Sequence, residues 1–303
     1  MAVEVTLGSP RGFCAGVVRA IDIVELALQR FGKPVYVRHE IVHNPVVVED
    51  LRRKGAIFID ELREVPEGQL VIYSAHGVSP AVRLEAEERR LRVIDATCPL
   101  VTKVHLEALK FGGQAHTIVL VGHRNHVETI GTSGEVPERT IVVETPEEAE
   151  AVQVADPGKV VVLTQTTLSV DDTADVITVL KRRFPGIIIR NDICYATTNR
   201  QAVVKELAKD SDLILVIGAK NSSNCNRLRE VAEAHGVTAH LVNGPEEVTD
   251  DLVGAAHRIG IVSGASTPEH LVQAVVRKLG PGRVKTVPVV DENVTFVLPR
   301  ELR

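Results

Sequence analysis

The sequence predicts an α/β protein made of three similar lobes, each built on a parallel β-sheet. Short β-branched runs alternate along the chain with amphipathic helical patterns, as in βαβ units. The loops between these runs fall into three sets, and each set opens with a cysteine: Cys14, Cys98 or Cys194. The repeat is one of architecture, because the three thirds share little sequence.

The individual elements follow from hydrophobic spacing. Strand-like runs are expected at residues 3–7, 35–38, 70–74, 93–95, 117–122, 160–164, 187–190, 213–218 and 259–263. Helices with apolar residues three or four apart are expected at residues 17–31, 79–91, 101–111, 171–184, 198–209, 226–235 and 268–279. A last strand-like run is expected at residues 294–298.

The repeat gives a domain division. We expect lobes at residues 1–96, 97–194 and 195–282, with Cys194 at the start of the third, and a tail at 283–303 that packs back on the body. Two polar loops follow each cysteine: His43 and His76, then His126 and Thr166, then Asn224 and Ser266. Ligands of open parallel sheets bind beyond the carboxyl ends of the strands. Three lobes with pseudo-threefold symmetry would therefore bring these loops to one centre.

Composition argues against several classes of protein. The chain has 303 residues, with 35 Lys and Arg against 40 Asp and Glu, and a formal net charge of −5. Nucleic-acid binding has no general electrostatic support, and an aromatic content of 3% leaves few side chains to stack on bases. No apolar run approaches the roughly 20 residues of a membrane span, and the first residues do not resemble a signal peptide. We expect a cytoplasmic protein that binds neither nucleic acid nor membrane.

The three cysteines occupy equivalent places, each between a strand and a helix. A helix N-terminus stabilises a thiolate through its unpaired amides and dipole. A single cysteine of this kind would most simply be a buried free thiol. Three converging thiolates indicate a soft metal, and the lack of a Cys-x-x-Cys pair argues against a zinc ribbon. Three thiolates can hold a cubic iron–sulfur cluster and leave one iron open. Cys225 has no counterpart in the other lobes, so we interpret it as a bystander and an oxidation liability near the site.

Polar side chains at the remaining strand-to-helix turns suit phosphate oxygens. Imidazoles, hydroxyls, amides and helix N-termini all bind phosphate, although each Ser or Asn alone could be only a helix cap. The candidates are His43, His76, Ser222, Ser223, Asn224 and Ser266. No glycine-rich nucleotide-binding motif is present.

The densest ionisable cluster is His-Arg-Asn-His-Val-Glu at residues 123–128. Here Glu128 follows His126 by two residues and could donate or relay a proton. The alternative is an ordinary surface loop. Likewise the run at residues 164–169, which contains Thr166, could be only the capped start of a helix.

Taken together, the motifs resemble one family, the 4-hydroxy-3-methylbut-2-enyl diphosphate reductases. The resemblance covers essentially the whole chain. It is carried by the following segments: Gly-Phe-Cys-Ala-Gly-Val at 12–17, Arg-His-Glu-Ile-Val-His-Asn at 38–44, Ser-Ala-His-Gly-Val-Ser at 74–79, Asp-Ala-Thr-Cys-Pro-Leu-Val at 95–101, Thr-Gln-Thr-Thr-Leu-Ser-Val-Asp-Asp at 164–172, Asp-Ile-Cys-Tyr-Ala-Thr-Thr-Asn-Arg-Gln at 192–201, Lys-Asn-Ser-Ser-Asn at 220–224, Gly-Ala-Ser at 264–266 and Pro-Arg-Glu-Leu-Arg at the end of the chain.

The resemblance implies the last step of the non-mevalonate isoprenoid pathway, in which an allylic hydroxyl is removed reductively to give isopentenyl and dimethylallyl diphosphates. It implies one 4Fe–4S cluster with an open apical iron, held by Cys14, Cys98 and Cys194. It places Thr166 at the substrate hydroxyl and makes Glu128 the proton source. The residues implied around the diphosphate are His43, His76, His126, Thr166, Ser222, Ser223, Asn224 and Ser266. It also implies a separate electron donor, such as ferredoxin or flavodoxin, and we expect a monomer or weak homodimer.

Two departures and two alternatives accompany this hypothesis. The family usually has proline where this chain has Val127, which could loosen the loop that aims Glu128, and it has serine where this chain has Cys225. An electron-transfer or iron-sensing protein would need the cysteines but not the anion-binding loops or Glu128. A cluster-free protein that binds a phosphorylated metabolite would be colourless after anaerobic purification.

Overall fold

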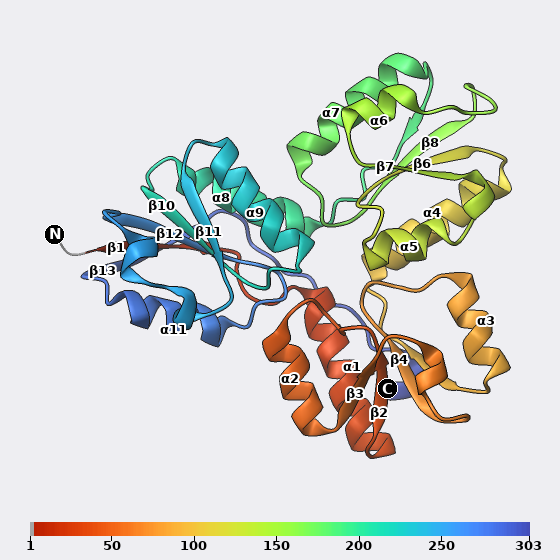
Figure 1. Ribbon diagram of the computed structural model, residues 1–303, viewed down its shortest axis with the longest axis horizontal. Helices are drawn as coiled ribbons and strands as arrows, with labels where there is room; N and C mark the ends of the chain where they lie inside the picture. Colours follow the sequence, from red (N-terminus) through yellow and green to blue (C-terminus); the bar gives the residue numbers. More distant parts are fainter. Residues whose placement is uncertain (1–2) are drawn as a thin grey trace. The chain divides into compact units, whose positions relative to one another are not determined.

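A computed structural model describes residues 3–303 of the chain (Figure 1). The chain divides into two compact units. The first unit consists of the residues up to Val17, together with His43–Val47 and Cys194–Thr295. The second consists of Val18–Val42, Val48–Ile193 and Phe296–Arg303. No helix within residues 3–303 is long and apolar enough to cross a membrane.

The first unit is built on one five-stranded sheet, called sheet A. All its strand pairs are parallel, in the order β11-β10-β12-β1-β13. The strands are β1 (Glu4–Ser9), β10 (Leu213–Ile217), β11 (Thr238–Val242), β12 (Arg258–Ser263) and β13 (Arg283–Pro288). The helices are α8 (Tyr195–Ala208), α9 (Ser223–Ala234), α10 (Asp250–Val253) and α11 (Glu269–Leu279), with the 3₁₀ turn η3 (Pro245–Glu247).

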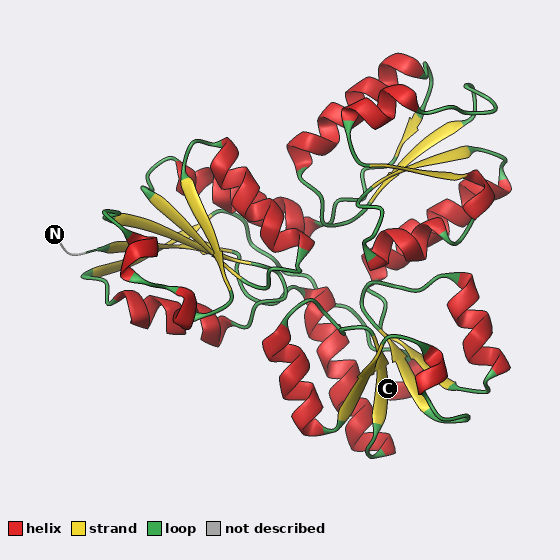
Figure 2. Ribbon diagram, in the orientation of Figure 1, coloured by secondary structure: helices red, strands yellow, loops and turns green. Residues whose placement is uncertain are grey.

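The second unit contains two four-stranded parallel sheets, B and C (Figure 2). Sheet B has the order β3-β2-β4-β5, from β2 (Val35–Arg38), β3 (Ala56–Ile59), β4 (Leu70–Tyr73) and β5 (Arg92–Asp95). Sheet C has the order β7-β6-β8-β9, from β6 (Thr117–Val121), β7 (Thr140–Val143), β8 (Val160–Thr164) and β9 (Ile188–Ile189).

The helices that accompany sheets B and C complete the βαβ pattern. They are α1 (Ala15–Phe31), α2 (Pro45–Lys54), α3 (Pro80–Glu88), α4 (Pro99–Gly113), α5 (Val127–Ser133), α6 (Pro146–Ala151) and α7 (Val170–Arg183). Short 3₁₀ turns lie at η1 (Leu62–Glu64), η2 (Pro137–Arg139) and η4 (Arg300–Leu302). The prediction of three parallel-sheet α/β lobes is therefore confirmed.

Burial on both faces explains why the central strands are apolar throughout. In β10, Leu213, Leu215 and Ile217 belong to the core on the α11 side, whereas Ile214 and Val216 belong to the core with α8 and α9. Successive side chains of a strand point to opposite faces, so a strand covered on both sides has no polar face. Sheet C likewise has one core with α6 and α7 and another with α4.

The strand assignments differ from the expected lobe boundaries at both ends of the chain. The strand β1 was expected in the lobe 1–96, but it pairs with β12 and β13 in sheet A. The expected tail 283–303 contributes β13 to the same sheet, and residues 294–298 form no strand. Local spacing predicts that a segment is extended but does not select its partner, so these pairings lay outside the sequence pattern.

Candidate functional site

Each of the three predicted cysteines directly precedes a helix, as the sequence indicated. Cys14 comes before α1, and Cys98 and Cys194 are the N-cap residues of α4 and α8. None of the three forms a disulfide, all are partly accessible, and neither N-cap thiol makes a capping hydrogen bond. Cys14 and Cys194 belong to the first unit, and Cys98 belongs to the second.

In the first unit, the neighbouring strands β1, β12 and β10 of sheet A are followed by the loops of Cys14, Ser266 and Asn224. After β12, the backbone carbonyl of Ala265 accepts a hydrogen bond from the Cys14 amide at 3.0 Å. The hydroxyl of Ser266 donates to the backbone carbonyl of His43 at 3.0 Å. The phenol of Tyr195 accepts from the Ala15 amide at 3.2 Å. These contacts hold the loops of Cys14, His43, Cys194 and Ser266 in one hydrogen-bonded group.

The loop after β10 brings the predicted Ser-Ser-Asn run to the N-terminus of α9. Ser222 is the N-cap and accepts from the amide of residue 225, and Ser223 begins the helix. Asn224 is only 6% exposed, yet neither its Oδ1 nor its Nδ2 has a hydrogen-bond partner among residues 3–303. Buried polar atoms are nearly always paired, so this amide is available to a ligand. Its Nδ2 lies against Gly264, in the loop that carries Ser266.

Cys225 is enclosed rather than presented to a site. Its side chain is fully buried in the core with α8 and α9, and burial raises the pKa of its thiol to about 11. Its sulfur would lie 2.3 Å from a Cβ on Gly218 and 2.2 Å from one on Gly264, so glycine is required at both positions. A buried protonated thiol reacts slowly, which limits the oxidation liability expected from the sequence.

Cysteine accessibility predicts a labelling pattern for cluster-free protein. Under native anaerobic conditions, iodoacetamide should modify Cys14, Cys98 and Cys194, and Cys225 should react only after unfolding. Peptide mass spectrometry of protein alkylated with and without denaturant measures this. Rapid native labelling of Cys225 would contradict its enclosure.

In the second unit, Glu128 is buried and paired with Thr166. The carboxylate accepts the Thr166 amide at 2.7 Å through Oε1 and the Thr166 hydroxyl at 2.9 Å through Oε2. The side chain is 3% exposed, and this burial raises the pKa of Glu128 to about 7, although the two Thr166 hydrogen bonds oppose the rise. A carboxylic acid with this pKa carries a transferable proton at neutral pH.

The two predicted histidines of the second unit contact each other. His126 is the N-cap of α5, and its Nδ1 accepts the Glu128 amide at 3.2 Å. An accepting Nδ1 carries no proton, so the neutral ring bears its proton on Nε2. His76, after β4, has Nδ1 3.2 Å from the Ser74 hydroxyl. The rings of His76 and His126 meet edge to face, with centroids 5.9 Å apart.

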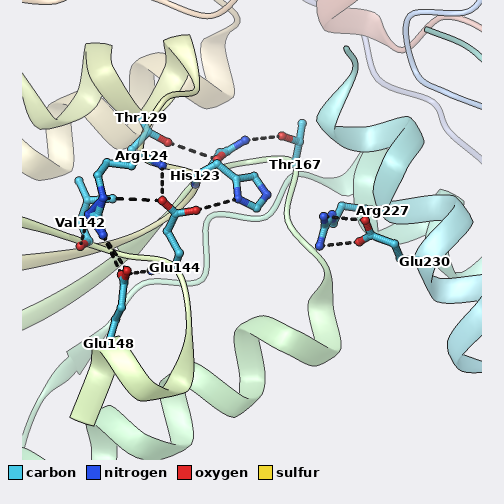
Figure 3. Close-up of polar contacts among 10 residues, drawn as sticks. His123, Arg124, Thr129, Val142, Glu144, Glu148, Thr167, Arg227 and Glu230 are labelled. Carbon is cyan, nitrogen blue, oxygen red and sulfur yellow. Dashed lines mark hydrogen bonds and ion pairs between the residues drawn. The ribbon is translucent and has the colours of Figure 1, made fainter. Parts of the chain in front are cut away.

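The loop before Glu128 is held by ion pairs on its outer side (Figure 3). The Arg124 guanidinium donates to both carboxylate oxygens of Glu148, at 2.9 and 2.8 Å. The Arg124 amide donates to Glu144 at 3.0 Å, and Nδ1 of His123 lies 3.4 Å from the same carboxylate. The cluster at residues 123–128 therefore divides into an outer part that fixes the loop and an inner part, His126 and Glu128.

Val127, where the family has proline, is the first residue of α5. Proline suits this position because it needs no amide donor, and the preceding His126 already has the extended geometry, φ −77° and ψ 136°, that proline imposes. We expect Val127→Pro to stabilise the fold by about 0.4–1 kcal/mol, chiefly by restricting the unfolded chain. Chemical denaturation checks this, with Val127→Ala as the control for side-chain loss. A loss of stability in Val127→Pro alone would show that the Val127 amide is needed.

Sequence reasoning missed a triad that supports this region, in which Glu135 and His105 are buried and Arg83 is partly exposed. The carboxylate of Glu135 accepts Arg83 Nη2 at 2.6 and 2.8 Å and lies 2.7 Å from Nδ1 of His105. Burial tends to raise the pKa of Glu135, but the contacts with His105 and Arg83 outweigh it and hold that pKa below its usual value. Nε2 of His105 would lie 2.9 Å from a Cβ on Gly77, beside His76. The three residues are distant in sequence, so no local motif could have revealed them.

The cysteine donor set fits an iron–sulfur cluster in its chemistry. The three partly accessible thiols at helix starts are of the ligand type that such clusters take, and the buried Cys225 is not. Within either unit of residues 3–303, no three His, Cys, Asp or Glu side chains are gathered as a metal site. The fit therefore rests on the type of ligand and on the equivalent places of the three cysteines in the chain.

Comparison with known proteins agrees with these motifs. The family model described as LytB protein matches residues 5–280. The chain is 57% identical to 4-hydroxy-3-methylbut-2-enyl diphosphate reductase of Bordetella pertussis, over 99% of this chain and 94% of that protein. It is 54% identical to the same-named protein of Azoarcus sp., over 99% and 98%.

A solved structure is similar over the same length. It is the E-1-hydroxy-2-methyl-but-2-enyl-4-diphosphate reductase from Plasmodium falciparum, with a TM-score of 0.97 and 39% identity over 100% of this chain and 97% of that one. The family resemblance predicted from the motifs is thus confirmed, and the chain belongs to the LytB protein family.

Proposed function

We propose that this protein is a 4-hydroxy-3-methylbut-2-enyl diphosphate reductase of the non-mevalonate isoprenoid pathway. Its substrate would be the (E)-isomer, and its products isopentenyl diphosphate and dimethylallyl diphosphate. The observation that carries the proposal is the Glu128–Thr166 pair, a buried acid with a pKa of about 7 in a chain whose relatives bear this name along nearly their whole length.

The reaction consumes two electrons and two protons. The carbon–oxygen bond breaks, one proton converts the departing hydroxyl to water, and the second forms the new carbon–hydrogen bond. Glu128 suits the first transfer because it is protonated near neutral pH and its orientation is fixed by two hydrogen bonds. Thr166 would hold the acid and contact the substrate hydroxyl region.

One 4Fe–4S cluster would be held by Cys14, Cys98 and Cys194. When bound, it supplies single electrons and an open iron that acts as a Lewis acid. This chain contributes no other redox group that the sequence reveals. A small ferredoxin or flavodoxin is therefore the proposed electron donor. The enzyme itself is proposed to be cytoplasmic and to be a monomer or weak homodimer.

The diphosphate would be held by the polar groups at the strand-to-helix turns. The unpartnered amide of Asn224 and the helix start at Ser222 and Ser223 suit phosphate oxygens, since amides and hydroxyls at a helix N-terminus favour anions. The other proposed contacts are His43, His76, His126 and Ser266. Fixing the diphosphate orients the allylic carbon, and such orientation can supply a large part of the reduction in the activation barrier.

Turnover of hydroxymethylbutenyl diphosphate tests the proposal. Protein purified without oxygen is assayed with a chemical one-electron reductant, and iron and sulfide are counted on the same sample. Formation of both five-carbon diphosphates supports the reductase. A fully loaded but inactive protein favours an electron carrier or sensor, and a protein that takes up no iron after reconstitution overturns the cluster.

A further inference from the structure

A positively charged residue recurs early in each of the three helices that follow a cysteine. Arg19 lies five residues after Cys14, Lys103 five after Cys98, and Arg200 six after Cys194. Each charged group binds the short loop before a different cysteine: Arg19 the loop before Cys98, Lys103 the loop before Cys194, and Arg200 the loop before Cys14. Each of these contacts lies within a single compact unit. The name cysteine-loop cations is used below for these three residues.

Arg19 on α1 holds the loop before Cys98. Its Nη1 donates to the backbone carbonyls of Ala96 at 3.2 Å and Thr97 at 3.0 Å. Its Nε donates to the backbone carbonyl of Val297 at 2.9 Å. Backbone carbonyl groups that precede a helix have no hydrogen-bond partner in that helix. By donating to both carbonyls, the Arg19 guanidinium fixes the direction in which they point.

Lys103 on α4 holds the residue two before Cys194. Its Nζ lies 2.9 Å from Oδ1 of Asp192, whose side chain is 1% exposed. The Asp192 amide in turn donates to the Thr164 hydroxyl at 3.0 Å. The Asp192 carboxylate is buried, and the Lys103 ammonium is a cation that contacts it directly. Removing Lys103 would leave that carboxylate buried without its cation.

Arg200 on α8 holds the residue two before Cys14. Its Nη2 donates to the backbone carbonyl of Gly12 at 2.9 Å, and its Nη1 donates to Ala196 at 3.0 Å and to Glu292 at 2.9 Å. The guanidinium is 1% exposed. Together with the Ala15–Tyr195 hydrogen bond, this contact joins the Cys14 loop directly to the first turns of α8.

We propose that the cysteine-loop cations Arg19, Lys103 and Arg200 are positioning residues that fix the three cysteine loops for the iron–sulfur cluster. Each ties the loop before one proposed ligand to the helix that begins at another, which restricts that loop in the cluster-free protein. Their charges also favour the more negative, reduced cluster, because nearby charge contributes to cluster potential. The inference rests on the proposed cluster, and none of the three residues is a proposed ligand or substrate contact.

Lys103→Met is the decisive variant, because Lys103 is 49% exposed and its loss should leave the fold intact, whereas Arg200 is 1% exposed and its loss would disturb a buried network. Residues that orient metal ligands typically contribute roughly 10- to 100-fold to metal affinity. Iron release from the reconstituted protein to an excess of chelator should therefore be roughly 10- to 100-fold faster in Lys103→Met than in wild type. The midpoint potential should move to a more negative value. Lys103→Arg should restore both, because it keeps the charge and reach.

Lys110→Met is the matched control, since Lys110 lies on the same helix and its ammonium contacts the neighbouring Phe111 ring instead of a cysteine loop. The cluster-free Lys103→Met protein should still unfold in one cooperative transition, at a lower temperature than Lys110→Met because Asp192 loses its cation, which excludes a general loss of fold. If Lys103→Met releases iron at the control rate with an unchanged potential, the positioning role is wrong. If wild type itself binds no iron, it is the proposed cluster that fails.

Discussion

Replacing Glu128 with glutamine is expected to lower turnover of hydroxymethylbutenyl diphosphate by about 100-fold or more, with iron content unchanged. A positioned general acid typically contributes about 10²–10⁴-fold, and glutamine keeps the shape of the side chain but has no transferable proton. The amide oxygen of the introduced glutamine can still accept the Thr166 amide, so the local structure should survive. Initial rates and iron and sulfide counts on the same preparations measure both quantities.

The raised pKa of Glu128 gives this prediction a pH signature. Only the protonated acid can donate, so the wild-type rate should fall as pH rises through about 7. Thr166→Val removes a hydrogen bond that favours the carboxylate, so the pKa should rise and the fall should move to higher pH. A rate that does not change with pH across neutrality, in wild type and in Thr166→Val alike, would remove Glu128 from the proton transfer.

The raised pKa of Glu128 also makes the free energy of unfolding depend on pH. Because the folded pKa lies above the unfolded value of 4.5, ionising Glu128 opposes folding. That cost is absent below about pH 4.5 and complete above about pH 7. Glu128→Gln should therefore be more stable than wild type at about pH 8, by on the order of 3 kcal/mol at most, and similar at about pH 4.5. Denaturation of cluster-free proteins at the two pH values checks the difference.

Sequence patterns predicted the repeated strands and helices well because their burial is regular. The runs at β2 and β8 were predicted with the bounds that the structure has, Val35–Arg38 and Val160–Thr164. The strands β3, β7, β11 and β13 were missed, as were the helices α2, α5, α6 and α10 and the pairing of β1 with β12. The strands β3, β7 and β11 lie at sheet edges and are irregularly buried, and pairing between distant segments leaves no local signal.

The site shows the same division between local and tertiary information. Cys98 could be placed at a helix start from the sequence, since the turn pattern is local, whereas the helix that contains Glu128 was not predicted. The burial that gives Glu128 a pKa of about 7 depends on the fold around Thr166, 38 residues away. Arg200 would be interpreted from sequence as an exposed residue on a helix, yet it is 1% exposed, because its partners Gly12 and Glu292 come from opposite ends of the chain.

The largest expected change in cofactor content is the loss of the cluster when any one of Cys14, Cys98 or Cys194 becomes serine. Iron should fall from about four atoms per chain to a small fraction of that, because a cubic cluster with an open iron has only three protein ligands to lose. Turnover should fall to background in all three variants. Iron, sulfide and the visible absorption of anaerobically reconstituted protein measure the loss.

Serine at Cys98 and Cys194 separates the loss of a cluster ligand from a loss of helix stability. Cys98 and Cys194 are N-cap residues whose thiols make no capping hydrogen bond, and serine is among the best N-cap residues. The substitution should therefore preserve or slightly raise the stability of α4 and α8, and loss of iron cannot be attributed to unfolding. Thermal unfolding of the cluster-free variants tests that point directly.

Cys225→Ser is the matched control within the same chain. Cys225 also lies in the first turn of a helix, but it is fully buried, and serine there should leave iron content at the wild-type level. Loss of iron in Cys225→Ser together with retention in Cys98→Ser would contradict the three-cysteine assignment. Retention in Cys225→Ser with loss in the other three would show that accessibility at a helix start, and not cysteine alone, determines which thiols bind iron.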